Sequence, residues 1–159
     1  MSFLPMYTID FETYYDKDYS LSKMTTEEYI RDPRFEVIMV GVIFPDGSRA
    51  VMHPGEFRAF ATKVPWDQHS ILAHHAHFDG RILARHFGVF PGFWYDTLSM
   101  ARALHGINVS GSLKTLMELY GVGQKGTVVH DMKGRHRASL TSVEWSEYAA
   151  YCMNDCVGT

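Results

Sequence analysis

Two carboxylates stand two positions apart in residues 8–13, Thr-Ile-Asp-Phe-Glu-Thr, where the apolar run from Phe3 to Ile9 ends. The run predicts a strand that enters a core, and because side chains alternate along a strand, Asp10 and Glu12 share one face. Beside a core their repulsion requires a compensating cation, and carboxylate oxygens are the ligands that hard divalent ions such as Mg²⁺ prefer. A polar strand end facing solvent is the alternative. Whether the chain carries further carboxylates therefore decides between a metal site and a solvent-exposed strand end.

The composition indicates one compact globular domain. The chain has 159 residues, 46% of them hydrophobic and 14% aromatic, which excludes a disordered chain. No apolar run approaches the ~20 residues of a membrane span and no export signal is recognisable, so we expect a cytoplasmic protein. Cys152 and Cys156 are expected to stay reduced there. A formal net charge of -3 gives no global basic footprint, so nucleic-acid binding has to be local.

The order of apolar and turn segments predicts an α/β domain with a mixed sheet. Three strands come early, and two of them form a hairpin across Pro45-Asp46-Gly47-Ser48. Shorter strands then alternate with helices. The expected strands are residues 3–9, 36–44, 49–53, 70–74 and 93–95. The expected helices are residues 25–30, 55–62, 79–87, 97–104, 113–120 and 141–156, with loops at 14–22 and 123–138.

Two further carboxylates lie in helical segments. Asp79 follows the predicted strand at 70–74 and falls near a first helical turn, where capping is the alternative role for an isolated acid. Asp155 stands four residues after Tyr151, so the two share a helix face that would otherwise be a packing stripe. A solvated Asp155 is the alternative, but negative charge near a helix C-terminus opposes the helix dipole.

In this order the motifs resemble those of the DEDD 3′-5′ exonucleases. The matching segments are Asp10-x-Glu12-Thr13, Phe78-Asp79 and Tyr151-x-x-x-Asp155. The tyrosine is typical of the subgroup found in proofreading domains of family A DNA polymerases. The subgroup with a general-base histidine would carry it five residues before the last Asp, where this chain has Ala150.

The resemblance covers nearly the whole chain, from residue 7 to residue 157. Segments 31–40, 95–102 and 121–126 are similar to the exonuclease regions of bacteriophage polymerases. The resemblance implies a ribonuclease H-like fold with a mixed five-stranded sheet, three antiparallel strands followed by parallel ones, flanked by helices. It also implies one exonuclease domain over residues 1–159. A polymerase domain follows in the relatives, so a polymerase in cis or trans is the implied partner, and a standalone nuclease or a fragment of a longer chain both stay open.

The activity implied by the resemblance is two-metal hydrolysis at the 3′ ends of single-stranded DNA, releasing nucleoside 5′-monophosphates in proofreading. Two divalent ions, Mg²⁺ or Mn²⁺, would lie roughly 3.5–4 Å apart. Asp10 would bridge both ions, and Glu12 with Asp155 would complete the one that activates water. Asp79 would hold the other ion through its water shell. Tyr151 would orient the attacking water, because an ordinary pKa of about 10 makes tyrosine a poor base.

Four residues are expected to contact the substrate. Thr13 would touch the 3′ end and Phe78 would pack near the terminal base, although plain core packing is equally expected for Phe78. His75 stands where the family usually has an Asn that helps to hold the terminal nucleotide, and it can still donate a hydrogen bond. Lys125 lies in the basic stretch 123–138, which either follows the backbone of single-stranded DNA or is an ordinary solvated loop.

Competing interpretations concern the substrate and the chemistry. An RNA-trimming exonuclease of the same superfamily keeps the chemistry and changes the substrate. A catalytically silent nucleic-acid-binding module is a second alternative, which the presence of all four acids and the tyrosine disfavours. A zinc site at His74, His75 and His77 is disfavoured, because neighbouring strand positions point to opposite faces and no cysteine is close in sequence.

Overall fold

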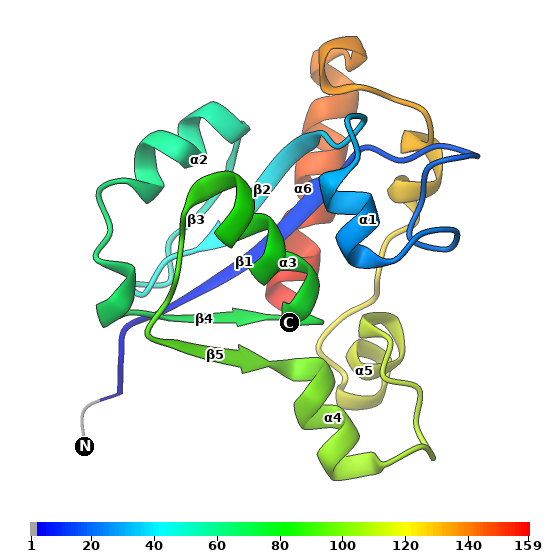
Figure 1. Cartoon of the computed structure of the whole chain (residues 1–159). Coiled ribbons are helices and arrows are strands. Elements are labelled where there is room, and N and C mark those ends of the chain that lie inside the picture. The colour runs from blue at the N-terminus through cyan, green and yellow to red at the C-terminus, as the bar shows by residue number, and fades with distance from the viewer. Residues whose placement is uncertain (1–2) are drawn as a thin grey trace.

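A mixed five-stranded sheet runs through the protein with helices on both of its faces (Figure 1). The computed structural model describes residues 3–159. The strands lie in the order β3-β2-β1-β4-β5, where β1–β2 and β2–β3 pair antiparallel and β1–β4 and β4–β5 pair parallel. The strands are β1 (Met6–Thr13), β2 (Val37–Ile43), β3 (Arg49–Met52), β4 (Ser70–Ala73) and β5 (Phe93–Asp96). The predicted three antiparallel strands followed by parallel ones are therefore confirmed.

The helices divide between the two faces of the sheet. In Figure 1, α2 and α3 lie on the near face, α6 lies on the far face, and α4 and α5 extend beyond the β5 edge. The helices are α1 (Thr26–Arg31), α2 (Pro54–Ala61), α3 (Ala76–Ile82), α4 (Thr97–His105), α5 (Leu113–Tyr120) and α6 (Ser142–Gly158). Short 3₁₀ segments are Trp66–Gln68, Val128–Met132 and Arg137–Ser139, and a π-helical turn spans Leu83–Phe87.

Strand β1 is the centre of the core because both of its faces are covered. Ile9 and Phe11 point to the side of α2 and α3, where the Phe11 ring lies 5.7 Å from that of Phe57 and 5.6 Å from that of Phe87. Aromatic pairs at such distances favour edge-to-face or offset packing and bury large apolar areas. The opposite face of β1, which carries Asp10 and Glu12, lies under α6. Glu12 is therefore buried and Asp10 is half-buried.

Close approach of α6 to the sheet depends on Gly41, the β2 residue paired with Asp10. A Cβ atom at Gly41 would lie 2.7 Å from Cys156 Sγ and 2.9 Å from Cys152 Sγ, distances that no packed side chain tolerates. Helix α6 begins with a capping box, a pattern readable in the spacing of Thr141 and Glu144: the Thr141 side chain accepts from the Glu144 backbone N–H, and the Glu144 side chain accepts from the Thr141 backbone N–H. The start of this helix is thus local in origin, whereas its placement depends on a residue a hundred positions away.

Three segments differ most from the sequence-based prediction. β1 begins at Met6 and not at Phe3, whose side chain is 88% exposed, because Pro5 has no backbone N–H to donate to a ladder. Helix α3 begins at Ala76, three residues before the predicted start at Asp79, directly after the tight corner at His75. The predicted loop at 123–138 contains two 3₁₀ segments, Val128–Met132 and most of Arg137–Ser139.

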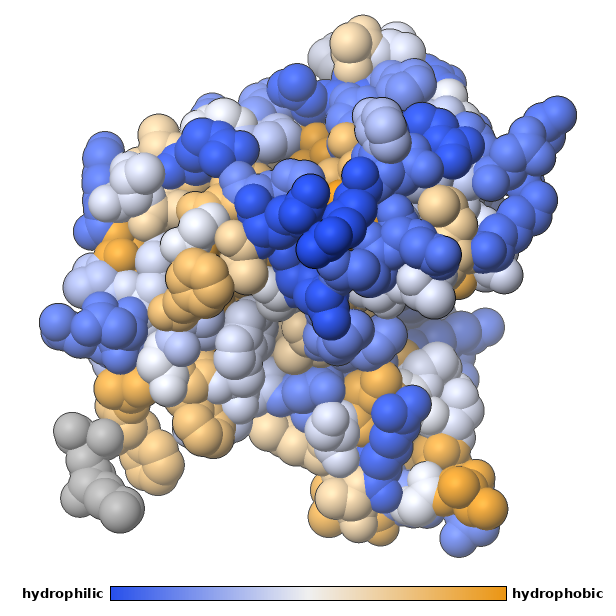
Figure 2. All heavy atoms as spheres, viewed as in Figure 1, coloured by the Kyte–Doolittle hydropathy of each residue, from blue (hydrophilic) through white to orange (hydrophobic). Residues whose placement is uncertain are grey.

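Charged side chains join α1 to α3 on the face shown in Figure 2, where a hydrophilic area occupies the middle of the view. Glu27 of α1 pairs with Arg31 on its own helix and with Arg81 of α3. The exposed hydrophobic side chains include several in and next to α4 and α5, among them Leu104 and Ile107. Over residues 3–159, no helix has the length and apolar character that a membrane span requires.

Candidate active site

Four acids, Asp10, Glu12, Asp79 and Asp155, form an acidic cluster. The cluster lies at a gap in the sheet, where β4 ends beside the middle of β1. β4 pairs with β1 only as far as Thr8 opposite Leu72 and ends at Ala73, so the β1 backbone beyond Thr8 has no strand on that side. Asp79 occupies this position: its Oδ1 accepts a hydrogen bond of 3.3 Å from the Phe11 backbone N–H. The first turn of α3 thereby brings Asp79 to the strand that carries Asp10 and Glu12.

Helix α6 supplies the opposite wall through one face. Tyr148 Oη donates a 2.8 Å hydrogen bond to Glu12 Oε2, and Cys152 Sγ lies 3.7 Å from Asp10 Oδ2. Tyr151 and Asp155, one helical turn apart on the neighbouring stripe, are both buried. The structure therefore brings together all five residues for which the sequence predicts catalytic or metal-binding roles: Asp10, Glu12, Asp79, Tyr151 and Asp155.

Burial and mutual repulsion alter the protonation of these acids. Burial, and next the charge of Asp155, raises the pKa of Asp10 from 3.8 to about 7. Burial and the neighbouring Asp10 also raise the pKa of both Glu12 and Asp79 well above their usual ranges. Desolvation disfavours a charged carboxyl and a nearby like charge disfavours it further. Such a cluster holds several negative charges only when a cation compensates them.

The donor atoms of the cluster fit a hard divalent cation. Asp155 Oδ1 is buried and has no hydrogen-bond partner among the described residues, which is unusual for a carboxylate oxygen. An oxygen of Asp10, an oxygen of Glu12 and the sulfur of Cys152 lie within 4.8 Å of one another. A hydrogen bond with Cys156 and burial raise the pKa of the Cys152 thiol, so the sulfur stays protonated. The available ligands are thus carboxylate oxygens, which suit Mg²⁺ or Mn²⁺ better than zinc.

A pocket of about 250 Å³ opens beside Glu12 and is lined by Thr13, Phe78, Leu21 and Tyr15, among others. Thr13 and Phe78, both expected to contact the substrate, therefore lie on one surface next to the acids. The Thr13 hydroxyl is also hydrogen bonded to Tyr29 Oη at 2.8 Å.

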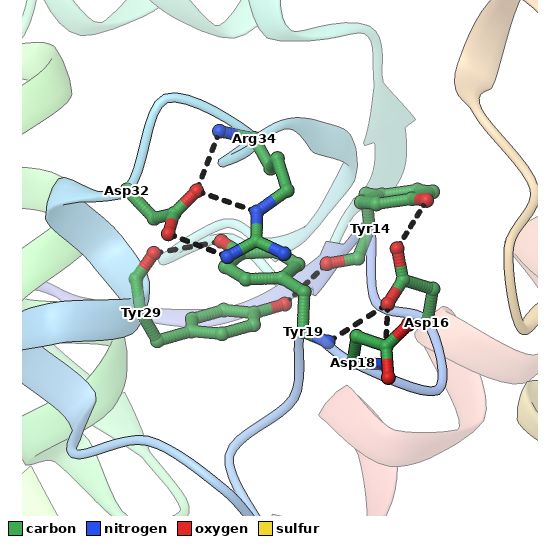
Figure 3. Close-up of polar contacts among 7 residues, drawn as sticks. All are labelled: Tyr14, Asp16, Asp18, Tyr19, Tyr29, Asp32 and Arg34. Carbon is green, nitrogen blue, oxygen red and sulfur yellow. Dashed lines mark hydrogen bonds and ion pairs between the residues drawn. The ribbon is translucent and has the colours of Figure 1, made fainter.

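The wall of this pocket is held by a network of aromatic and charged side chains (Figure 3). Tyr19 and Tyr29 stack with their ring centroids 4.4 Å apart, and Tyr19 Oη donates to the Tyr29 carbonyl. Arg34 lies over the Tyr19 ring at 4.7 Å while its guanidinium binds both oxygens of Asp32. Asp16 closes the segment by accepting from the Tyr19 backbone N–H. The loop at 14–22 is therefore a structured wall.

His75 occupies a tight corner between β4 and α3. Its backbone is left-handed, with φ 63° and ψ 53°, a conformation that is uncommon for residues other than Gly, although Asn, Asp and His adopt it more often than the rest. Asp96 Oδ1 holds the corner by accepting from the N–H groups of His75 and Ala76, at 2.9 and 3.3 Å. The imidazole of His75 is exposed and stacks near that of His77 at 6.3 Å. His75 thus adjoins the site through the backbone that leads to Asp79.

Two cationic side chains of the basic stretch 123–138 form ion pairs within the protein. Lys125 Nζ lies 2.7 Å from Asp155 Oδ2, and Arg135 forms an ion pair of 2.9 Å with Glu144. The Arg137 backbone N–H is bound by Glu36. Lys125 therefore lies in the acidic cluster, a position that the sequence interpretation did not anticipate.

Sequence reasoning also missed Tyr148 and Cys152 as members of the site. The sequence assigns Tyr148 no role in the site, yet its hydroxyl donates a hydrogen bond to Glu12. The helical period offered a signal, because Tyr148, Cys152 and Asp155 recur at the three- and four-residue spacings of one helix face. For Lys125 no such signal exists, since it lies in a segment without periodicity.

The chain resembles known proteins both in sequence, through a protein-family model, and in fold, through solved structures. A protein-family model described as 3′-5′ exonuclease matches residues 49–157. That match begins after Asp10 and Glu12, so their place in the site rests on the geometry above. No curated protein matches the chain by sequence.

Solved structures share the ribonuclease H-like fold at low identity. RNase D of Trypanosoma brucei is 14% identical with a TM-score of 0.66, and the match covers 98% of this chain and 55% of that one. NrnC of Brucella melitensis with bound Mg²⁺ is 19% identical with a TM-score of 0.59, covering 96% and 66%. The catalytic core of RRP6 from Trypanosoma brucei is 14% identical with a TM-score of 0.62, covering 96% and 38%.

The chain thus spans less than two thirds of the length of each of these three structures. The match to the family model covers more than half of this chain. The chain therefore belongs to the 3′-5′ exonuclease family.

Proposed function

We propose that this protein is a metal-dependent exonuclease that removes nucleoside 5′-monophosphates from the 3′ ends of single-stranded nucleic acid. The observation that carries the proposal is the cluster of four carboxylates from β1, α3 and α6 beside a buried tyrosine, in which Asp155 Oδ1 has no partner among the described residues. Asp10, Glu12, Asp79 and Asp155 would hold two Mg²⁺ or Mn²⁺ ions. Such a pair of ions supplies a nucleophile at neutral pH and stabilises the attacking and leaving oxygens of an in-line displacement.

The protein's own residues position the reactants. Burial, and next the charge of Asp155, raises the pKa of Tyr151 above its usual value, so its hydroxyl stays protonated and orients the attacking water. Tyr148 holds Glu12 through its hydrogen bond. A water oxygen attacks the terminal phosphorus and releases one proton to solvent. The bond to the 3′ oxygen of the preceding nucleotide breaks, and that oxygen takes up one proton from solvent.

The pocket beside Glu12 has the position that a terminal nucleotide requires. Its lining combines the Thr13 hydroxyl with the apolar Leu21 and the aromatic Phe78, next to the acids. Base stacking on aromatic side chains is tolerant of sequence and typical of single-strand binding. We propose that Thr13 contacts the 3′ end, that Phe78 packs against the terminal base, and that His75 contacts the terminal nucleotide from the corner at the start of α3.

Of the two substrates, RNA has more support from the comparisons than DNA. One of the similar solved structures is RNase D of Trypanosoma brucei in complex with RNA U12, with a TM-score of 0.66 at 12% identity. Proofreading of DNA is supported by the resemblance of three short segments to bacteriophage polymerases. We therefore propose RNA trimming as the first function to test, and DNA proofreading as the second.

The test uses 5′-labelled single-stranded RNA and DNA of one sequence, incubated with the protein in Mg²⁺, in Mn²⁺ and in EDTA. We expect ladders that shorten from the 3′ end, that EDTA abolishes and that are stronger for RNA. Asp10→Asn should abolish them, whereas Asp67→Asn, which changes an exposed acid outside the site, should leave them unchanged.

Each other outcome has a defined meaning. Faster degradation of DNA would reverse the order of the two substrates. If the protein binds the RNA or the DNA but cleaves neither in Mg²⁺ or Mn²⁺, the result would contradict the proposed activity and support a catalytically silent binding module.

A further inference from the structure

The segment Gln124, Lys125 and Gly126 is fastened across α6 at the acidic cluster. Asn154 Nδ2 donates a 3.0 Å hydrogen bond to the Gln124 carbonyl. Gly126 packs directly on the Tyr151 ring, where an added Cβ would lie 3.1 Å from a ring carbon. Two contacts, one on each side of Lys125, thus hold its backbone over the site.

The Lys125 side chain turns from this segment into the cluster. Its Nζ lies 2.7 Å from Asp155 Oδ2 and 5.6 Å from the centroid of the Tyr151 ring. The side chain of Lys125 is 29% exposed and that of Asp155 is 5% exposed, so the pair is largely withdrawn from water. Among residues 3–159, this is the one ion pair within 4.0 Å that involves any of the four clustered acids.

The two oxygens of Asp155 therefore have different environments. Oδ2 is neutralised by an ammonium group, while Oδ1 is buried without a partner. Charge-assisted hydrogen bonds between buried groups are strong, so a divalent ion that takes up Asp155 has to replace or share the bond with Lys125.

We propose that Lys125 is a built-in counter-ion that competes with the divalent metal for Asp155. The proposal rests on the metal site of the proposed function. Lys125 neutralises Asp155 until a metal binds, and metal entry shifts the ammonium away from the carboxylate. The metal affinity of the protein is consequently lower than the four acids alone would give, and the segment 124–126 moves with the metal.

Direct metal binding tests this competition without any nuclease assay. Protein stripped with EDTA and dialysed is titrated with Mn²⁺, and free Mn²⁺ is followed by electron paramagnetic resonance. We expect K125M to bind Mn²⁺ about tenfold more tightly than the wild type, which corresponds to roughly 1.4 kcal/mol. Lys133→Met is the matched control, because Lys133 is an exposed lysine of the same basic stretch 123–138, and the Mn²⁺ affinity of this variant should equal that of the wild type.

A second variant covers the case in which K125M is too unstable without metal. Asn154→Ala keeps the ammonium and removes only the hydrogen bond to Gln124, so it should tighten Mn²⁺ binding two- to threefold. Equal or weaker binding by K125M would overturn the competition, and where K125M is too unstable to titrate, equal or weaker binding by Asn154→Ala would overturn it.

Asp155→Asn separates this proposal from the proposed function. If it weakens Mn²⁺ binding while K125M has no effect, Asp155 is a ligand and only the competition is wrong. If it leaves Mn²⁺ binding unchanged, Asp155 is not a ligand, and both the competition and the proposed metal site are wrong.

Discussion

Tyr148 Oη donates a hydrogen bond of 2.8 Å to Glu12 Oε2, joining residues 136 positions apart in the chain. The bond links the first strand to the last helix, and both groups are buried. Burial, and next the charge of Glu12, keeps the pKa of Tyr148 above its usual value, so the phenol remains a donor. Tyr148 thus orients an acid that the proposed function places at the metal.

Tyr148→Phe should impair the protein in two ways. Loss of the donor leaves a buried carboxylate without a partner, which should lower the free energy of unfolding by about 1–3 kcal/mol. Glu12 also loses its orientation, so Mn²⁺ binding and kcat should both fall. Urea denaturation and Mn²⁺ titration check this result against Tyr120→Phe, which removes a hydroxyl that is bonded only to His105 at the exposed end of α5. Equal Mn²⁺ affinity in Tyr148→Phe and the wild type would contradict the orienting role.

Gly41→Ala should push α6 away from the sheet. The new Cβ would lie 2.7 Å from Cys156 Sγ, so either the helix or the strand has to move. Overpacking of a core typically costs about 1–3 kcal/mol, and here it would also displace Asp155 from Asp10. We expect a lower melting temperature together with weaker metal binding. Gly55→Ala, where nothing lies within 4 Å of the new atom, should lower neither property, and it can raise the melting temperature because Gly55 lies in helix α2.

The stability of the EDTA-treated protein should depend on the charge of Asp10. The pKa of Asp10 is raised from 3.8 to about 7 in the folded state, so the folded state binds its proton more tightly than the unfolded state does. The stability that protonated Asp10 contributes to the folded state is fully present below about pH 4 and is lost as the pH rises through about 7. Asp10→Asn, which mimics the protonated acid, should therefore gain stability relative to the wild type between pH 5 and 8.

Comparison with Asp10→Asn separates the effect of Asp10 from that of two half-buried histidines, whose effect on stability has the opposite dependence on pH. Burial lowers the pKa of His74 and of His86, so they favour the folded state as the pH rises through their range. Saturating Mg²⁺ should reverse the ranking at pH 8, because metal binding requires deprotonated carboxylates. Thermal denaturation of both proteins at each pH, with and without Mg²⁺, measures the difference. A difference that does not change with pH would show that Asp10 titrates normally.

His75 and His77 should respond oppositely to the same pair of substitutions. The left-handed backbone of His75 favours glycine, so His75→Gly should be more stable than His75→Ala by roughly 1 kcal/mol. His77 lies within α3, where Ala is favoured over Gly by roughly 1 kcal/mol. Chemical denaturation of the four variants tests the corner directly, and the same order at both positions would contradict the left-handed conformation.

Local patterns in the sequence predicted much of the fold and the order of the site residues. The alternation around Asp10 and Glu12 placed both on one face of a strand, and the capping box at Thr141 placed the start of α6. The spacing of four residues placed Tyr151 and Asp155 on one face of that helix. Each of these inferences depends on residues only a few positions apart, whose relative geometry the backbone period sets.

The tertiary structure decided the relationships between distant segments. Asp79 reaches the Phe11 backbone only because β4 ends where β1 continues, and Lys125 meets Asp155 only because a segment without periodicity lies across α6. The sequence determined which elements form and which faces carry acids, since those properties arise from local backbone geometry. Which acids meet, and which cation meets them, follows from long-range packing, because it brings together groups that no periodic pattern relates.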